Sequence, residues 1–353
     1  MRAFLIGAGA ALSLGGCAAT MPNPPWAVGE QPALVQARVE TVVDTDPTVD
    51  ADDPALWADA KNPARAVMFG TDKTDGLYVH NMDGTVRQFL PSGPLNNVDT
   101  RTGFVVDGRE QVLVAATNDG KMGINLYLFD PATMVTRDWG FVATDMGEPY
   151  GSCMGRSGDD FYLIANNKLG DIKQWRVRAG ASGPEVTLLG SRKLASQLEG
   201  CVSDDVNGVL YVGEEDVGIW AFPLDATITA EPRSVARVDR KRITDDVEGL
   251  TIMQDGDSRY LIASSQGDST FAVFRIADGI ETYVGRFAVI DGVTIDGVTE
   301  TDGVDAWSGP IGPFAEGALA MHDDRDGNGP QQNFKIVDWR DVRAALNLVA
   351  PSR

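Results

Sequence analysis

The chain has 353 residues, of which 43% are hydrophobic, and carries 51 acidic against 30 basic side chains, a formal charge of −21. Such a field repels nucleic acid and anionic lipid headgroups, so we expect neither as a partner. Most of these carboxylates are interpreted as a solvated surface, but those that recur at a fixed spacing require another explanation.

The first 16 residues predict an export signal. Arg2 is followed by a short apolar run that ends in Leu-Gly-Gly-Cys. The run is too short to span a bilayer, and this ending is typical of a lipoprotein cleavage site. We expect lipidation at Cys17, with a plain secretory signal as the alternative. The mature protein is then an outer-membrane lipoprotein or a periplasmic or secreted protein, held to the membrane by its lipid alone.

Residues 17–33 hold four prolines among small and polar residues and predict an extended tether. The remaining residues, 34–353, are assigned to a single domain. Within that domain a short pattern recurs six times. Each copy has a hydrophobic run, two to four polar residues, a glycine and a second alternating run, and the copies begin at Ala66, Val112, Phe161, Leu210, Tyr260 and Ala318.

Equivalent positions of these copies are separated by 46, 49, 48, 51 and 57 residues when Gly70, Ala116, Ala165, Gly213, Ser264 and Met321 are aligned. A β-rich repeat of roughly 40–50 residues is typical of a propeller blade. The sequence therefore predicts an all-β fold, a six-bladed β-propeller. We expect a monomer.

Polar residues recur at two places in each copy, so we expect two rings of side chains around one mouth of the central channel. One ring follows the first hydrophobic run and comprises Asp72, Lys73, Asn118, Asp119, Asn167, Lys168, Glu214, Glu215, Ser265, Gln266, Asp323 and Asp324. The other precedes each copy and comprises Asp52, Asp53, Asp99, Arg101, Tyr150, Glu199, Asp246, Glu248 and Asp302.

The residues and motifs that the sequence lacks exclude several classes of active site. Only two histidines are present, His80 and His322, so histidine-rich zinc or iron sites cannot be built, and we interpret both as surface or loop residues. The sequence has no G-x-S-x-G motif, P-loop or dinucleotide fingerprint. Cys153 and Cys201 occupy equivalent places in neighbouring copies, which leaves a disulfide and two buried thiols equally open.

Carboxylates in glycine-bounded loops are abundant instead, and such oxygen ligands favour calcium. Residues 324–329 match the opening of a calcium-binding loop, but Lys335 stands where that loop needs a glutamate, so a plain turn is an equal alternative. Lys73, Lys168 and Arg101 lie among the acids. They are either structural ion pairs or, together with bound metal, the binding groups of a polyanionic substrate.

Nine blocks of the chain, in order and in all six copies, resemble the β-propeller phytases. They are DADDPALW from Asp50, GTDKTDGLYV from Gly70, LNNVDTR from Leu95, LEGCVSDD from Leu198, LYVGEEDVGIW from Leu210, DDVEGLTI from Asp245, ASSQGDSTF from Ala263, TDGVDA from Thr301 and QNFKIVDW from Gln332. The resemblance implies a phosphomonoesterase that needs several calcium ions and hydrolyses calcium phytate by attack of a calcium-bridged water. It implies phosphate acquisition as the role.

The resemblance also implies roles for individual residues. The cleavage-site ligands correspond to Tyr150, Glu199, Glu215, Glu248, Asp296 and Asp302. Lys73 and Lys168 correspond to lysines that grip phosphate. Further calcium ligands correspond to Asp52, Asp53, Val98, Asp246, Gln266 and Asp323. We expect Arg101 to contribute to substrate binding as well.

Two departures reduce the positive charge expected at one phosphate subsite. Asp119 stands where the family commonly has arginine, and Thr74 where it has a second lysine; Lys121 is the candidate replacement. Two alternatives therefore stay open: a calcium-loaded propeller that binds a phosphorylated ligand without turnover, and a propeller lactonase or esterase. The scarcity of histidine disfavours the second alternative.

Overall fold

The computed structural model describes residues 26, 28–42, 49–227, 230–327, 329 and 331–351. The predicted signal, the lipidation site Cys17 and the first part of the tether lie outside these residues. Within the described part of the chain, no helix combines the length and the apolar character needed to cross a bilayer.

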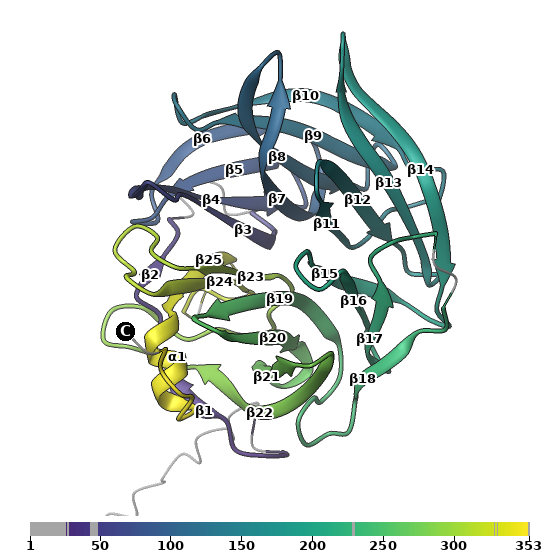
Figure 1. Ribbon diagram of the computed structural model, residues 1–353. Helices are drawn as coiled ribbons and strands as arrows, with labels where there is room; N and C mark the ends of the chain where they lie inside the picture. Colours follow the sequence, from purple (N-terminus) through teal and green to yellow (C-terminus); the bar gives the residue numbers. More distant parts are fainter. Residues whose placement is uncertain are drawn as a thin grey trace, which may run out of the picture.

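Six antiparallel sheets form a ring, as Figure 1 shows, so the prediction of a six-bladed β-propeller is confirmed. The innermost strands of successive sheets contact one another around the whole ring. These innermost strands are β3 (Ala51–Asp59), β7 (Leu95–Val106), β11 (Ser152–Ser157), β15 (Leu198–Asp204), β19 (Val247–Asp255) and β23 (Val304–Ser308).

The second strand of each blade contains the hydrophobic run that defines the sequence repeat. These strands are β4 (Asn62–Asp72), β8 (Arg109–Asn118), β12 (Asp160–Asn166), β16 (Val209–Glu214), β20 (Ser258–Ser265) and β24 (Gly317–Asp323). Their aliphatic residues are buried on both faces, because each sheet is covered by the blade on either side.

The third and fourth strands form the outer part of each blade and become more exposed toward the rim. The third strands are β5 (Gly76–Asn81), β9 (Gly123–Asp130), β13 (Asp171–Gly180), β17 (Gly218–Pro223), β21 (Thr270–Ala277) and β25 (Asn333–Asp338). The outer strands of the first five blades are β6 (Val86–Pro91), β10 (Val135–Ala143), β14 (Gly183–Lys193), β18 (Arg233–Arg237) and β22 (Ile280–Val289).

The N-terminal strands complete the two C-terminal blades. Strand β2 (Val39–Glu40) pairs antiparallel with β25 and supplies the outer strand of blade six, with Glu40 opposite Lys335. Strand β1 (Ala33–Val35) adds to the edge of blade five, parallel to β22. Residues 28–30, which we expected within the tether, are also held on blade five, where the Arg286 guanidinium donates to the Glu30 carbonyl.

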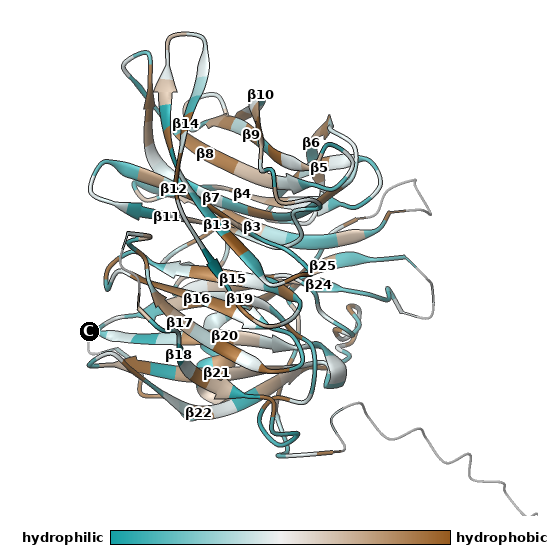
Figure 2. Ribbon diagram, turned by 90° about the vertical axis from the view of Figure 1, so that its right-hand side faces the viewer, coloured by the Kyte–Doolittle hydropathy of each residue, from teal (hydrophilic) through white to brown (hydrophobic). Residues whose placement is uncertain are grey.

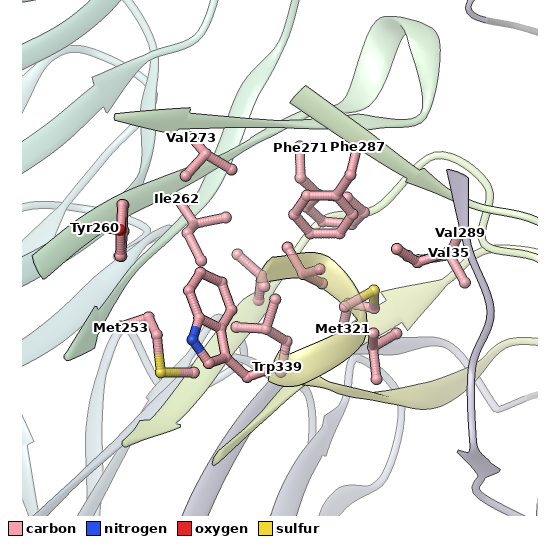
Figure 3. Close-up of a cluster of buried hydrophobic side chains, with 14 of the residues drawn as sticks. Val35, Met253, Tyr260, Ile262, Phe271, Val273, Phe287, Val289, Met321 and Trp339 are labelled. Carbon is pink, nitrogen blue, oxygen red and sulfur yellow. The ribbon is translucent and has the colours of Figure 1, made fainter. Parts of the chain in front are cut away.

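Hydrophobic side chains from adjacent blades pack into shared clusters, and in Figure 2 the brown segments follow the strands while most connecting loops are teal. One cluster lies where the chain ends meet the ring (Figure 3). There Trp339, at the start of helix α1 (Trp339–Ala345), packs with Val35 of β1 and with the stacked Phe271 and Phe287. Apolar packing therefore supports the ring closure made by β1 and β2.

Candidate active site

Three glutamates converge at one mouth of the channel. Glu199 and Glu248 are the second residues of the innermost strands β15 and β19, and Glu215 directly follows β16. One carboxylate oxygen from each lies within 4.8 Å of the others. Glu199 and Glu248 are only 2% and 5% exposed, so this is a buried acidic cluster rather than a solvated face.

Glycines bring these residues together. Each cluster residue on an innermost strand is followed by glycine, and the backbone of the next blade occupies the space where a side chain would be. A Cβ at Gly151 would lie 1.8 Å from the Glu199 carbonyl oxygen, and one at Gly200 would lie 1.9 Å from that of Glu248. The same arrangement, a site residue followed by a glycine that lets the next blade approach closely, recurs at Tyr150-Gly151, Glu199-Gly200, Glu248-Gly249 and Asp302-Gly303.

The electrostatics of the cluster favour a cation. Burial, the proximity of Glu199 and the hydrogen bond between these two carboxyls hold the pKa of Glu248 well above its ordinary range. Burial chiefly raises the pKa of Glu215 to about 7. Among the described residues, neither Glu215 Oε1 nor Glu248 Oε2 has a hydrogen-bond partner. Buried carboxylate oxygens without donors suit a hard divalent ion, so the cluster fits a metal site.

Lys73 connects this cluster to the next two blades. Its ammonium lies 3.1 Å from Asp52 Oδ1 and 2.9 Å from Asp302 Oδ2. Gln266 donates to the other oxygen of Asp302. Burial opposes the charge on Lys73, but the two carboxylates outweigh it and raise the pKa of the lysine. The structure therefore gathers Asp52, Lys73, Gln266 and Asp302 beside the three glutamates.

Tyr150 and Lys168 lie on the other side of the cluster. The Tyr150 hydroxyl hydrogen-bonds with Glu199, and burial is the main cause that raises the tyrosine pKa. The Lys168 ammonium lies 4.1 Å from the centre of the Tyr150 ring and 3.1 Å from Glu148 Oε1. Lys168 is also 47% exposed at its side chain, so its charge remains accessible from solvent.

Asp119 adds a further acid near these cations. Burial, with a contribution from Glu148, raises its pKa to about 6. Lys121 donates its backbone N–H to Asn118 Oδ1 at 2.8 Å and so helps to form the turn next to Asp119. The structure places both residues beside the site, and the role of Lys121 in binding substrate stays a prediction.

Asp53, Val98 and Arg101 lie within the channel, which encloses a cavity of about 350 Å³. The Val98 N–H donates to Asp53 Oδ2 at 2.8 Å. Burial raises the pKa of Asp53 well above its ordinary value. Arg101 pairs with Asp99 and Asp205 at 2.8 and 2.9 Å. Arg101, which we grouped with the substrate lysines, thus forms ion pairs within the channel wall, and its role in substrate binding stays a prediction.

Asp296 and Asp323 belong to another group. They flank the ammonium of Lys335 at 2.7 and 3.0 Å, and Glu40 and Asp326 are the other two carboxylates around it. The Lys335 side chain is fully buried. We predicted Asp296 as a ligand of the cleavage site; the structure places it beside Lys335 of β25 in blade six, and the ligand role stays a prediction.

The remaining predicted ligand, Asp246, lies just before β19 in a left-handed backbone conformation, with φ of 49°. Its carbonyl accepts the Gln266 N–H at 3.0 Å, so the two predicted ligands are neighbours. Residues 324–329 turn back through a bond from the Gly329 N–H to the Asp326 carbonyl. Asn328 lies outside the described residues, and the calcium-loop and plain-turn interpretations of this segment both stay predictions.

Three members of the expected first ring accept backbone N–H groups of neighbouring loops. Asp72 Oδ1 accepts the Thr74 N–H, Asn167 Oδ1 accepts the Leu169 N–H, and Glu214 Oε1 accepts the Ser196 N–H. The residue after each of these, by contrast, faces the mouth. In these three pairs the first residue therefore holds the loop that presents the second.

Two expectations on other residues are settled by the structure. Cys153 and Cys201 form a disulfide between the innermost strands of blades three and four. Our interpretation of the histidines as surface residues is wrong: His80 lies in β5 and His322 in β24, with exposures of 4% and 1%. Both strands are covered by neighbouring blades, so sequence position alone gave no indication of their burial.

The geometry defines a class of protein: a six-bladed propeller with a buried acidic cluster that fits a metal site at one channel mouth and with lysines beside it. A sequence model of the phytase family matches residues 3–350. A 3-phytase of Bacillus subtilis (strain 168) is 35% identical over 328 residues, which cover 88% of this chain and 85% of that protein. The chain belongs to the phytase family.

A solved structure of BBS1N in complex with ARL6DN, soaked with lead, aligns with 84% of this chain and 79% of its own. Its TM-score is 0.48 and its sequence identity 11%.

Proposed function

We propose that this phytase hydrolyses phosphate monoesters of phytate, myo-inositol hexakisphosphate, to phosphate and lower inositol phosphates, and that it requires calcium. The observation that supports this most is the buried glutamate cluster with Lys73 and Lys168 on either side of it. A polyanion can bind at an acidic mouth only if metal ions reverse the local field.

Calcium would be held by Glu199, Glu215 and Glu248, with Asp52 and Asp302 beside them. Asp53, Asp246, Gln266, Asp323 and the Val98 carbonyl are the further candidate ligands. Bound calcium supplies charge neutralisation, polarisation of phosphoryl oxygens and a lower pKa for coordinated water.

The residues of the chain then have distinct tasks. Lys73 and Lys168 bind phosphate oxygens, because each presents an ammonium at the mouth and a charge-assisted hydrogen bond to phosphate is strong. Tyr150 orients Glu199 through its hydroxyl and supports Lys168 with its ring. Burial of the glutamates excludes bulk water and so strengthens every charge interaction in the site.

Capture of a phosphorylated ligand without turnover is the alternative function, and Asp119 argues against strong capture. An additional carboxylate next to Glu148 weakens the binding of a phosphate near Lys168 and leaves that subsite more dependent on metal. No specific observation favours a lactonase or esterase.

The test is phosphate release from phytate by the purified mature domain with calcium, with excess chelator and with calcium restored. We expect activity only in the first and third conditions. Glu199→Gln removes the charge at the centre of the cluster and is expected to abolish release, while Glu110→Gln, an exposed acid at the start of β8, serves as control. Activity that survives both the chelator and Glu199→Gln would reject the proposal.

We also propose that the protein is exported and anchored through a lipidated Cys17, with a monomeric catalytic domain. Mass spectrometry of the mature N-terminus and of a Cys17→Ala variant tests the anchor: a diacylglyceryl modification lost in the variant supports it. Light scattering of the lipid-free domain tests the monomer.

A further inference from the structure

His322 lies directly behind one of the site carboxylates. It occupies β24 of blade six and is 1% exposed. Its imidazole Nδ1 accepts the backbone N–H of Asp302 at 3.1 Å. The same residue bonds to the flanking backbone, since the His322 N–H donates to the Gly303 carbonyl and the Thr301 hydroxyl donates to the His322 carbonyl.

The hydrogen bonds of the ring fix its chemical form. A backbone N–H can only donate, so Nδ1 carries no proton and Nε2 carries one. Nε2 lies 3.1 Å from Gln332 Oε1, and Gln332 in turn donates to Asp324 Oδ1 at 2.9 Å. The imidazole is therefore a neutral Nε2–H tautomer, held at both nitrogens.

The group that His322 supports is a carboxylate bonded on both of its oxygens. Asp302 accepts from Lys73 on one oxygen and from Gln266 on the other. Its side chain can meet both partners only if its backbone keeps this orientation. The segment 299–303 has irregular structure, so no regular strand pairing holds the Asp302 N–H.

We propose that His322 is a positioning residue of the active site: its Nδ1 holds the Asp302 amide and thereby aims the Asp302 carboxylate at Lys73 and the calcium-binding cluster. It does not touch substrate. The kinetic test of this inference rests on the proposed function. The tautomer of His322 and its hydrogen bond to Asp302 can be tested without it.

Three variants separate positioning from packing. Asn places an amide oxygen close to Nδ1, Gln places its terminal group close to Nε2, and Leu fills volume without an acceptor. We expect His322→Asn to retain kcat for phosphate release within about threefold. Both His322→Gln and His322→Leu should lower kcat about ten- to a hundred-fold and raise the calcium concentration for half-maximal activity, the size of effect expected when a buried N–H loses its acceptor.

A readout independent of turnover is available because the chain has only two histidines. The ¹⁵N spectrum of ¹⁵N-histidine-labelled protein, expressed without a histidine tag and assigned with His80→Gln, should show the Nε2–H tautomer for His322. Calcium should shift its Nδ1 resonance. An Nδ1–H tautomer, or equal kcat in the Asn and Leu variants, would overturn the inference. Wild-type protein that shows the expected spectrum but releases no phosphate would reject the proposed function alone.

Discussion

Gly200→Ala provides the sharpest test of how the blades assemble the site. The new Cβ would lie 1.9 Å from the Glu248 carbonyl oxygen and 2.7 Å from its carbon. Both are backbone atoms, so no side chain can turn aside. Reaching an ordinary contact of about 3.4 Å requires blades four and five to separate by about 1.5 Å, and this moves Glu199 relative to Glu248.

The expected cost has two parts. Overpacking of this kind destabilises a protein by about 1–3 kcal/mol. A displacement of about 1 Å at reacting groups lowers the rate about a hundred-fold. We therefore expect kcat/KM for phytate to fall about a hundred-fold or more at temperatures where the variant is still folded.

The assay is phosphate release at saturating calcium, together with thermal unfolding followed by circular dichroism. Gly208→Asn is the matched control in the same blade, because Gly208 has a left-handed φ of 64° that asparagine tolerates and no atom within 4 Å of its Cβ position. A Gly200→Ala enzyme with wild-type kcat/KM would refute the close-approach argument.

Three further predictions concern stability. Burial lowers the pKa of His80 to about 4 from 6.5, so between these pH values the unfolded chain binds a proton that the folded chain does not. Stability should thus fall by about 3 kcal/mol as pH drops from 7 to 4, and urea unfolding of His80→Gln should lack this part of the pH dependence. Replacing Cys153 and Cys201 by serine opens a loop of 48 residues and should cost about 4 kcal/mol, measured by denaturant unfolding; an unchanged midpoint would count against the disulfide. Lys335→Met leaves four carboxylates without their ammonium and should cost about 3–5 kcal/mol at pH 7, measured by urea unfolding, and an unchanged unfolding midpoint would contradict this.

The blades could be predicted because each one repeats the same local signals within about fifty residues. The hydrophobic run of every copy became the second strand of a blade, including the loose sixth copy that starts at Ala318. The closure of the ring could not be predicted. Strands β1 and β2 are three and two residues long, and nothing in so short a segment indicates a partner such as Lys335, nearly three hundred residues away.

The same distinction applies to the site. Tyr150, Glu199 and Glu248 occupy equivalent places in their blades and Glu215 belongs to the other ring, and spacing and resemblance together predicted that these residues lie close to one another. The spacing of the repeats does not show how deep a side chain lies in the channel. Each residue along an innermost strand advances the chain by about 3.3 Å, so Arg101 lies further down the channel, away from the mouth.

One signal was present in the sequence but unused. A glycine follows the site residue at Tyr150, Glu199, Glu248 and Asp302. In the structure it is these glycines that allow neighbouring backbones to approach. The burial of His322, in contrast, depends on packing between blades and leaves no local mark in the sequence.

The seam between β2 and β25 has a consequence for how the protein is made. Glu40 leaves the ribosome long before Lys335, its partner across the seam. Until β25 is synthesised, blade six has no edge with which β2 can pair, so β2 stays unpaired. Completion of the ring is therefore a late event that joins the two ends of the chain, and contacts of such long sequence separation form slowly. A ribosome-bound chain that stops before β25 should carry up to five formed blades but an unclosed channel.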